Sequence, residues 1–321
     1  MNLPVAVGVG GVSLRAGRAG QRIQFACNPD FVIMPPMGQT AQRSTPVLRR
    51  RFFRMLLPLV SIYLIVGVVV TIFQRQMIYH PPVFTSQQVD QMAQASGLER
   101  WKNSAGESIG LKRPSPRQPA AGSVLIMYGN ASDAIGCADY ADAIQSVAAL
   151  DVFIVEYPGY ADRPGSPGQT SLFRAADEAF QLLATNGPVY LVGESLGTGV
   201  AAYLAGTHPG KVAGAILISP YNRLTSVAQY HMPVFPVHLL LTDRFPSEDY
   251  LCNFHGPIGM VVDGHDQVIP GKFGLRLYDG YAGPKRLWEF PNGEHASILE
   301  PPDQFWKEVV EFWRTNRSIS L

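Results

Sequence analysis

Short runs of apolar residues alternate with longer amphipathic segments from about residue 98 to the end of the chain. The apolar runs predict strands at 123–129, 151–159, 188–193, 213–220, 257–264 and 285–293, and a strand pair within 98–113. The amphipathic segments predict helices at 131–150, 171–187, 195–210 and 302–316. Short all-apolar strands separated by helices are typical of a parallel sheet covered on both faces. We therefore predict one α/β domain.

One segment interrupts this alternation. Residues 221–253, YNRLTSVAQYHMPVFPVHLLLTDRFPSEDYLCN, fit neither pattern and lie between two predicted strands. Ligands of α/β sheets bind beyond the carboxyl ends of the strands, where such an insertion can cover them. We expect a small lid at about 221–253.

An uncharged apolar stretch precedes the domain at residues 55–73, MLLPLVSIYLIVGVVVTIF. Its length matches the roughly 20 residues that a helix needs to cross a bilayer. A secretory signal peptide would have a shorter apolar core and a small-residue cleavage site, which the following residues do not offer. A core helix this apolar would need burial on all sides. We expect a single transmembrane helix at 55–73 that remains as an anchor, followed by the α/β domain at residues 76–321.

Charge is distributed unevenly about this stretch. The formal net charge is +1, but residues 1–54 carry eight arginines and one aspartate, so the remainder is acidic. Arginines crowd residues 49–54 before the span, and only Arg75 follows it within about 20 residues. The asymmetry predicts a cytoplasmic N-terminus and an α/β domain on the non-cytoplasmic side.

The first 54 residues are rich in Gly, Pro and Arg and show no periodicity, so we expect a disordered basic segment. A true start downstream of residue 1, at Met34, Met37 or Met55, stays open, because each of these methionines precedes or begins the apolar stretch.

The acidic remainder of the chain has no basic stripe, which argues against nucleic acid as a partner. Cys27, Cys137 and Cys252 lack CxxC spacing and predict neither a zinc site nor a disulfide framework.

Candidate chemistry centres on Ser195, in the sequence Gly-Glu-Ser-Leu-Gly between a predicted strand and helix. A GxSxG pattern alone is weak in a chain with 31 glycines. Its place at a strand-to-helix turn is what a serine nucleophile requires, because the unpaired N–H groups of the helix can stabilise an oxyanion. The other interpretation is that small residues merely allow a tight turn.

A serine nucleophile needs a base and an acid that orients the base. His295 follows the last predicted strand and is the base that we favour; His231, His238 and His255 fit packing or surface roles better. Asp263 and Asp266 compete for the acid, and we favour Asp266, since Asp263 ends its strand and can simply bond the loop. Binding of a metal by Asp263, His265, Asp266 and His295 is a weaker alternative, since no fixed ligand motif is present.

The second oxyanion donor is expected in the loop after residues 123–129, where the backbone N–H of Asn130 follows Gly129. The donor is main chain, so this role does not constrain the Asn130 side chain.

The order of these motifs, from Tyr128-Gly129-Asn130-Ala131 through EYPGYADRPGSPG, GESLG and DQVIP to GEH, resembles the α/β-hydrolase superfamily. It is similar in particular to membrane-anchored, lysophospholipase-like or serine aminopeptidase-type hydrolases with a small lid. The resemblance covers residues 76–317. It implies a Ser195, Asp266 and His295 triad, with the backbone N–H groups of Asn130 and Leu196 as oxyanion donors. Tyr128 stands where the family usually has His, and the loop from Gly264 to Asp266 is one residue short.

These features predict a single-pass, membrane-anchored serine hydrolase that cleaves an ester or thioester of a small or lipid-like acyl substrate and needs no cofactor. One alternative is a peptidase of the same fold, which would need a lid group such as Glu248 or Asp249 to hold a substrate amine. The other is a non-catalytic membrane scaffold, which would have no reason to keep a complete triad.

Overall fold

The computed structural model describes residues 46–297 and 304–316. The chain divides into two units, 1–55 and 56–321, and the boundary lies inside helix α1 (Pro46–Ile78). In the first unit the described residues are the first turns of this helix. Most of the segment expected to be disordered therefore lies outside the described residues.

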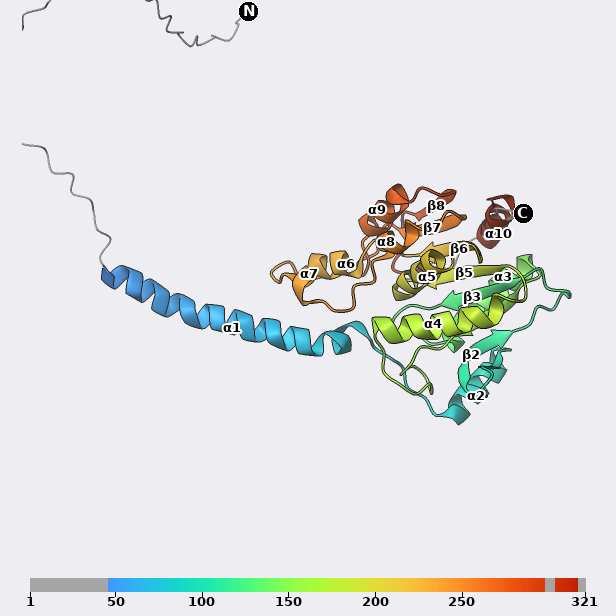
Figure 1. The fold of residues 1–321 in the computed structure, drawn as a ribbon, viewed down its shortest axis with the longest axis horizontal. Coiled ribbons are helices and arrows are strands. Elements are labelled where there is room, and N and C mark those ends of the chain that lie inside the picture. The colour runs from blue at the N-terminus through green and yellow to red at the C-terminus, as the bar shows by residue number, and fades with distance from the viewer. Residues whose placement is uncertain (1–45, 298–303, 317–321) are drawn as a thin grey trace, which may run out of the picture. The chain divides into compact units, whose positions relative to one another are not determined.

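The second unit contains an eight-stranded, mostly parallel sheet, which confirms the predicted α/β class (Figure 1). The spatial order is β1-β2-β4-β3-β5-β6-β7-β8, and β2 is antiparallel to both of its neighbours. The strands are β1 (Glu99–Lys102), β2 (Ser108–Arg113), β3 (Ser123–Met127), β4 (Asp151–Val155), β5 (Val189–Glu194), β6 (Val212–Ile218), β7 (Ile258–Asp263) and β8 (Lys285–Phe290).

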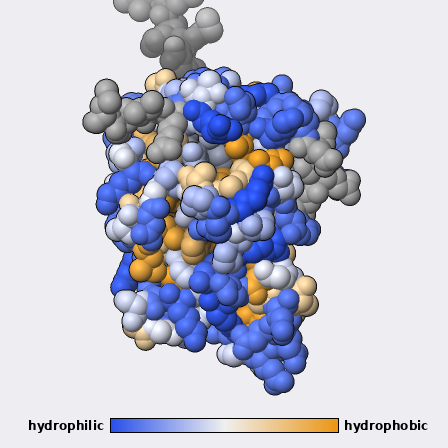
Figure 2. All heavy atoms as spheres, turned by 90° about the vertical axis from the view of Figure 1, so that its right-hand side faces the viewer, coloured by the Kyte–Doolittle hydropathy of each residue, from blue (hydrophilic) through white to orange (hydrophobic). Residues whose placement is uncertain are grey.

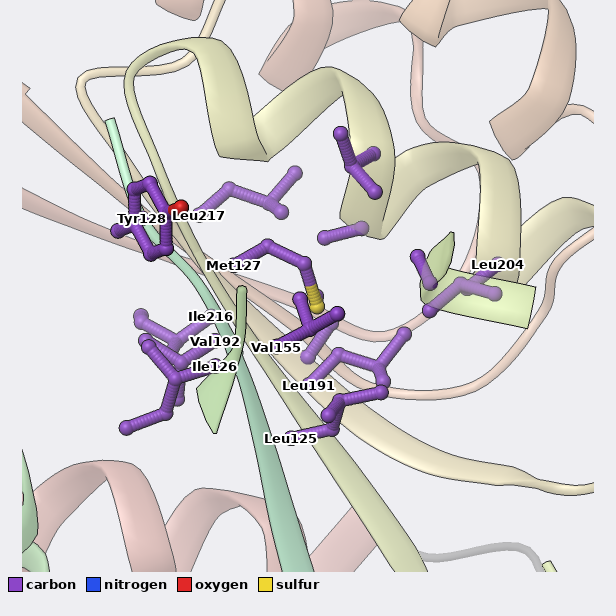
Figure 3. Close-up of a cluster of buried hydrophobic side chains, with 14 of the residues drawn as sticks. Leu125, Ile126, Met127, Tyr128, Val155, Leu191, Val192, Leu204, Ile216 and Leu217 are labelled. Atoms are coloured by element: carbon purple, nitrogen blue, oxygen red, sulfur yellow. The ribbon is translucent and has the colours of Figure 1, made fainter. Parts of the chain in front are cut away.

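The central strands are mostly apolar because both of their faces are covered. Every residue of β3 is buried, and its register sets Leu125 opposite Leu191 of β5 and Ile126 opposite Val192. Figure 3 shows these side chains packed together with apolar residues of β6. Burying one such side chain contributes about 1.5–3 kcal/mol, so this cluster fixes the strands whose ends carry the site.

Helices pack around the sheet, and several of them cover its two faces. They are α2 (Ser86–Ala95), α3 (Ala138–Val147), α4 (Gln169–Leu183), α5 (Leu196–Thr207), α6 (Leu224–His231), α7 (Val237–Leu240), α8 (Ser247–Leu251), α9 (Lys272–Gly280) and α10 (Gln304–Asn316), with the 3₁₀ turn η1 (Ile135–Cys137). On β5, Tyr190 stacks on Trp313 of α10, and Gly193 lies against Ala201 of α5. Residues three apart on a strand point to opposite faces, so α5 and α10 lie on opposite sides of the sheet.

Outside residues 221–253, two α-helices of the domain were not predicted from the sequence. Helix α2 begins at a capping box between Thr85 and Gln88, which was the available sequence signal for this helix. Helix α9 contains Gly274, which lowers helix propensity. A Cβ at Gly274 would lie 3.0 Å from Val262 Cγ2, so the glycine lets α9 pack closely on β7.

Helices α6, α7 and α8 occupy residues 221–253, hereafter called the insert, between β6 and β7. Ion pairs and hydrogen bonds join the end of α1 to this insert. Asp243 accepts a hydrogen bond from the Tyr79 hydroxyl at 2.8 Å and pairs with Arg75 at 3.3 Å. Gln74 Oε1 accepts the N–H of Thr242 at 2.8 Å. The last turns of α1 are therefore part of the folded domain.

Residues 51–78 of α1 form a helix long and apolar enough to cross a membrane, by length and composition. Its large side chains between residues 55 and 65 are mostly exposed, including Leu57, Leu59, Ile62 and Ile65. By contrast, the face of the domain at the right of Figure 1 is mostly hydrophilic, with apolar side chains in small interrupted patches (Figure 2). Among the described residues, most of the exposed large apolar side chains lie on α1.

Candidate active site

Ser195 stands at the turn between β5 and α5. Its backbone has φ 49° and ψ −116°, a conformation that costs a non-glycine residue about 1–3 kcal/mol. Its N–H donates to the carbonyl oxygen of Ile218 at 2.8 Å, and its own carbonyl oxygen accepts from the Thr198 hydroxyl at 2.6 Å. Bonds from β6 and α5 therefore hold the strained serine at the carboxyl edge of the sheet.

The glycines on either side of Ser195 are required by close backbone contacts. A Cβ at Gly197 would lie 2.0 Å from the Met127 carbonyl oxygen of β3. A Cβ at Gly193 would lie 2.8 Å from the Gly197 carbonyl oxygen and 2.9 Å from Ala201 Cβ. Real Cβ atoms do not approach other atoms so closely, so both positions of the GxSxG pattern need glycine for packing.

His295 lies between Ser195 and Asp266. Its Nε2 is 2.9 Å from Ser195 Oγ, and its Nδ1 is 2.7 Å from Asp266 Oδ2. With the proton on Nδ1, the ring donates to the carboxylate and can accept the serine proton, as a general base must. The other carboxylate oxygen, Oδ1, accepts the N–H groups of Val268 and Ile269 at 2.8 and 2.7 Å. The Asp266 side chain is only 1% exposed, so these bonds fix the group that orients His295.

Asp263, the competing candidate for the acid, has other partners. Its Oδ2 accepts from the Ser219 hydroxyl at 2.9 Å, and its Oδ1 accepts from the Ser297 hydroxyl at 3.1 Å. Ser219 Oγ in turn accepts the N–H of Ala296 at 3.1 Å. Burial raises the pKa of Asp263. Asp263 therefore holds the loop that carries His295, and Asp266 is the carboxylate that contacts the ring.

The loop after β3 lies beside Ser195. A Cβ at Gly129 would lie 3.2 Å from Ser195 Cβ and 2.8 Å from Glu194 Oε1, so only glycine allows this approach. Asn130 follows directly. On the other side, Leu196 is the first residue of α5, where backbone N–H groups have no acceptor within the helix. Both main-chain donors named from the sequence thus belong to segments that adjoin Ser195.

The side chain of Asn130 fastens this loop to the end of α1, a role that the sequence did not reveal. Its Oδ1 accepts the backbone N–H of His80 and the Tyr160 hydroxyl, both at 2.9 Å. Its Nδ2 donates to the Ile78 carbonyl oxygen at 2.5 Å. The position of the Asn130 main chain therefore depends on the residues that follow the apolar helix.

Two glutamates beside the site were also missed, and of these Glu156 is buried and Glu194 is half-buried. The Tyr128 hydroxyl donates to Glu156 and accepts the N–H of Tyr157 at 3.0 Å, so Tyr128, which replaces the usual His, is fully hydrogen-bonded. Burial raises the pKa of Glu156 to about 7. Glu194 accepts from the Tyr140 hydroxyl at 2.6 Å, and burial raises the pKa of Glu194 as well. The sequence EYPGY at 156–160 was the available signal for the first of these groups.

The other histidines considered as the base lie apart from Ser195, His295 and Asp266. His231 Nε2 lies 2.9 Å from the Val268 carbonyl oxygen, and His238 and His255 are exposed. Asp263 and Asp266 face different partners, and within 46–297 and 304–316 no group of three or more His, Cys, Asp or Glu side chains could hold a metal ion.

Comparisons with known proteins agree with this architecture. Residues 124–249 match a family model described as the alpha/beta hydrolase fold. The chain is 31% identical over 249 residues to the uncharacterized protein Rv2307c of Mycobacterium tuberculosis, an alignment that covers 74% of this chain and 88% of that protein. It is 27% identical to the uncharacterized membrane protein YNL320W of Saccharomyces cerevisiae, over 51% of this chain and 60% of the yeast protein.

A further relative is the alpha/beta hydrolase domain-containing protein 17B of Xenopus laevis, 27% identical over 59% of this chain and 65% of the frog protein. Among solved structures, the esterase Pf2001 of Pyrococcus furiosus superposes with a TM-score of 0.55 at 10% identity, covering 75% of this chain and 97% of the esterase. This last likeness concerns the fold alone. Together with the match to the family model and the mycobacterial relative, it shows that the chain belongs to the α/β-hydrolase superfamily.

Proposed function

We propose that this protein is a membrane-anchored serine hydrolase that cleaves a carboxylic ester or thioester through an acyl-enzyme. The observation that carries the proposal is the continuous contact from Ser195 Oγ through His295 to Asp266, at 2.9 and 2.7 Å. A strained serine, a base within hydrogen-bond reach and a buried carboxylate behind the base are the three parts that nucleophilic acyl transfer requires.

In the first half of the reaction, Ser195 Oγ attacks the acyl carbonyl carbon while His295 Nε2 takes the hydroxyl proton. The oxyanion that forms is stabilised by the N–H groups of Leu196 and Asn130. The tetrahedral intermediate collapses, and the alcohol or thiol leaves with the proton from His295. Asp266 keeps the proton of the ring on Nδ1 throughout and stabilises the imidazolium.

In the second half, His295 Nε2 takes a proton from water as the water oxygen attacks the acyl carbon. Collapse of the second intermediate breaks the bond to Ser195 Oγ, which recovers its proton from His295, and releases the carboxylic acid. The open depression of about 710 Å³ beside the imidazole, lined by residues 264–268 with Glu294 and His295, gives water a route to the ring.

The proposed anchor is α1. The exposed apolar side chains between residues 55 and 73 support it, because a water-exposed surface of this kind would be costly. The arginines at 49–54 favour a cytoplasmic N-terminus and a catalytic domain on the non-cytoplasmic side. In this arrangement residues 1–54 are a basic cytoplasmic segment, 55–73 are the span, and 76–321 are the hydrolase domain with a lid at 221–253.

The peptidase alternative is less well supported. Glu248 and Asp249, the groups that could hold a substrate amine, both pair with Arg223, and Glu248 also accepts from Asn222 Nδ2 at 3.1 Å. Arg276 also lies 3.6 Å from Glu248, so two guanidinium groups balance the two carboxylates, which therefore attract an ammonium group weakly. A non-catalytic scaffold would need neither the strained backbone at Ser195 nor the contacts of His295 with Ser195 and Asp266.

The test is phosphonate labelling and ester hydrolysis by the purified full chain in detergent. Ser195→Ala should abolish labelling, and both Ser195→Ala and His295→Ala should lower the specificity constant by at least about a thousandfold. Ser146→Ala, at an exposed serine of α3, is the matched control and should behave as wild type. Faster cleavage of aminoacyl amides than of esters would favour the peptidase, and a folded protein with neither labelling nor activity would favour the scaffold.

A further inference from the structure

An apolar cavity of about 160 Å³ lies between the last turns of α1 and the insert. Its walls include Val70 and Met77 from α1, and Ala228, Met232, Phe235 and Leu240 from the insert. Apolar cavities of about 150 Å³ remain dry and can take up a benzene-sized hydrocarbon. By size and lining, this cavity suits part of an alkyl chain.

The cavity is built by specific contacts between α1 and the insert. The Tyr63 ring stacks on Phe235 with centroids 5.4 Å apart, and the Tyr63 hydroxyl donates to the Val234 carbonyl oxygen at 2.8 Å. At the other end, Gln74 Oε1 accepts both the N–H and the hydroxyl of Thr242, at 2.8 and 3.0 Å. Bonds at both ends of the cavity keep its two walls together.

Two walls of the cavity connect directly to the proposed catalytic loops. The carbonyl oxygen of Ile78 accepts from Asn130 Nδ2 at 2.5 Å, and Asn130 belongs to the loop beside Ser195. His231 Nε2 lies 2.9 Å from the carbonyl oxygen of Val268, whose N–H donates to Asp266 at 2.8 Å. Two residues of the cavity wall therefore bond to the loops on the oxyanion and acid sides of the site.

The surroundings of the cavity point to the bilayer as the source of its occupant. Residues 224–242 contain no Asp, Glu, Lys or Arg. The insert exposes Tyr230, Val234 and Leu239, which are among the few large apolar side chains exposed outside α1 in the described residues. Tyr63 lies ten residues before the end of the span at 73, or roughly 15 Å along the helix. With residues 55–73 as the proposed span, the insert residues that contact Tyr63 would lie at the depth of the hydrocarbon.

We propose that this cavity binds the acyl chain of a substrate lipid that enters sideways from the bilayer between α1 and the insert. The inference rests on the proposed function, because Ser195 would attack the carbonyl at the head of that chain. It identifies the substrate class as long-chain acyl esters or thioesters held in a membrane.

The test fills the cavity and measures the dependence of hydrolysis on acyl length. Leu240→Trp and Ala228→Phe place bulk in the cavity, and Leu239→Trp places the same bulk on the neighbouring exposed leucine. The full chain is assayed in phosphatidylcholine vesicles with esters of about four and about twelve carbons. One buried methylene is worth about fourfold in binding, so the filling variants should lower the long-to-short ratio of specificity constants by at least about tenfold. Leu239→Trp should leave the ratio unchanged.

Short-chain hydrolysis separates the possible failures. Its retention in Leu240→Trp or Ala228→Phe shows that the variant is folded, and an unchanged long-to-short ratio in a folded variant overturns the proposal. Absence of short-chain hydrolysis in the folded wild type would refute the proposed function instead.

A second measurement does not depend on catalysis. Full-length Ser195→Ala in the same vesicles is irradiated with a long-chain ester that carries a diazirine near the end of the chain. Crosslinks should fall on residues 70–78 and 228–241 and disappear when Leu240→Trp is added. Crosslinks that persist in the filled variant would show contact with the outer surface of α1 only and would overturn the cavity as the binding site.

Discussion

Asp266 Oδ2 lies 2.7 Å from Nδ1 of His295, whereas Asp263, three residues earlier, directs its two oxygens at serine hydroxyls. The difference predicts separate effects for two matched substitutions. Asp266→Asn should lower kcat by about 10³- to 10⁴-fold, because an amide facing the ring favours the wrong tautomer. Asp263→Asn should mainly lower stability. Steady-state kinetics alongside thermal unfolding distinguish them, and near-normal kcat in Asp266→Asn would move the acid to Asp263.

Glu156 makes folding sensitive to pH. Burial raises its pKa from an ordinary value of 4.5 to about 7. Between these values the folded state keeps a proton that the unfolded state releases, so stability falls as pH rises from about 4.5 to about 7, by roughly 3 kcal/mol in all. Glu156→Gln, which resembles the protonated acid, should remove this loss. Denaturant midpoints at about pH 5 and about pH 8 measure the effect.

The exposed Glu99→Gln supplies the control for this experiment, because its side chain is 56% exposed. It should leave the pH dependence of the midpoint as in wild type. If wild type and Glu156→Gln instead show parallel pH profiles, Glu156 does not carry a raised pKa.

Gly197 is expected to tolerate no side chain. Its Cβ would lie 2.0 Å from the Met127 carbonyl oxygen, and neither backbone segment can move without displacing Ser195 or the loop that carries Asn130. Gly197→Ala should therefore lose activity together with several kcal/mol of stability, as overpacked core positions do. Gly210→Ala, where a Cβ would have nothing within 4 Å, should unfold as wild type does. A stable and active Gly197→Ala protein would show that the contact relaxes.

The proposed orientation can be tested with a reporter that is active only outside the cytoplasm. Fused after Leu321, it should be active, because the arginines before the span favour a cytoplasmic N-terminus. The same reporter fused after Arg54 should be silent at equal expression. The reverse pair of results would place the catalytic domain in the cytoplasm.

Much of the fold could be predicted because its signals are local. The strand at 123–127 is apolar from Val124 to Met127 since both faces are covered, and this is visible in the sequence. Ser195, Asp266 and His295 each follow a strand closely, so parallel strand order alone brings them to one edge. Helix α9 was missed because Gly274 obscures its helical character, and the reason for that glycine, a contact with Val262, is tertiary.

The parts of the site that could not be predicted depend on distant pairings. The Asn130 side chain bonds Ile78 and His80, which are about fifty residues away in the chain. The alkyl-sized cavity likewise has one wall from residues 70–78 and another from 228–241. No periodicity or spacing within either segment indicates that the other will lie against it.

The bonds from α1 to the insert have a practical consequence for handling this protein. A soluble form that begins after Tyr79 would lack the hydroxyl that Asp243 binds and the guanidinium of Arg75 beside it, so a buried carboxylate would lose both partners. It would also lack Ile78, the acceptor for Asn130 beside the serine. Such a truncation would be a damaged enzyme rather than an untethered one, and its low activity would say little about the natural protein.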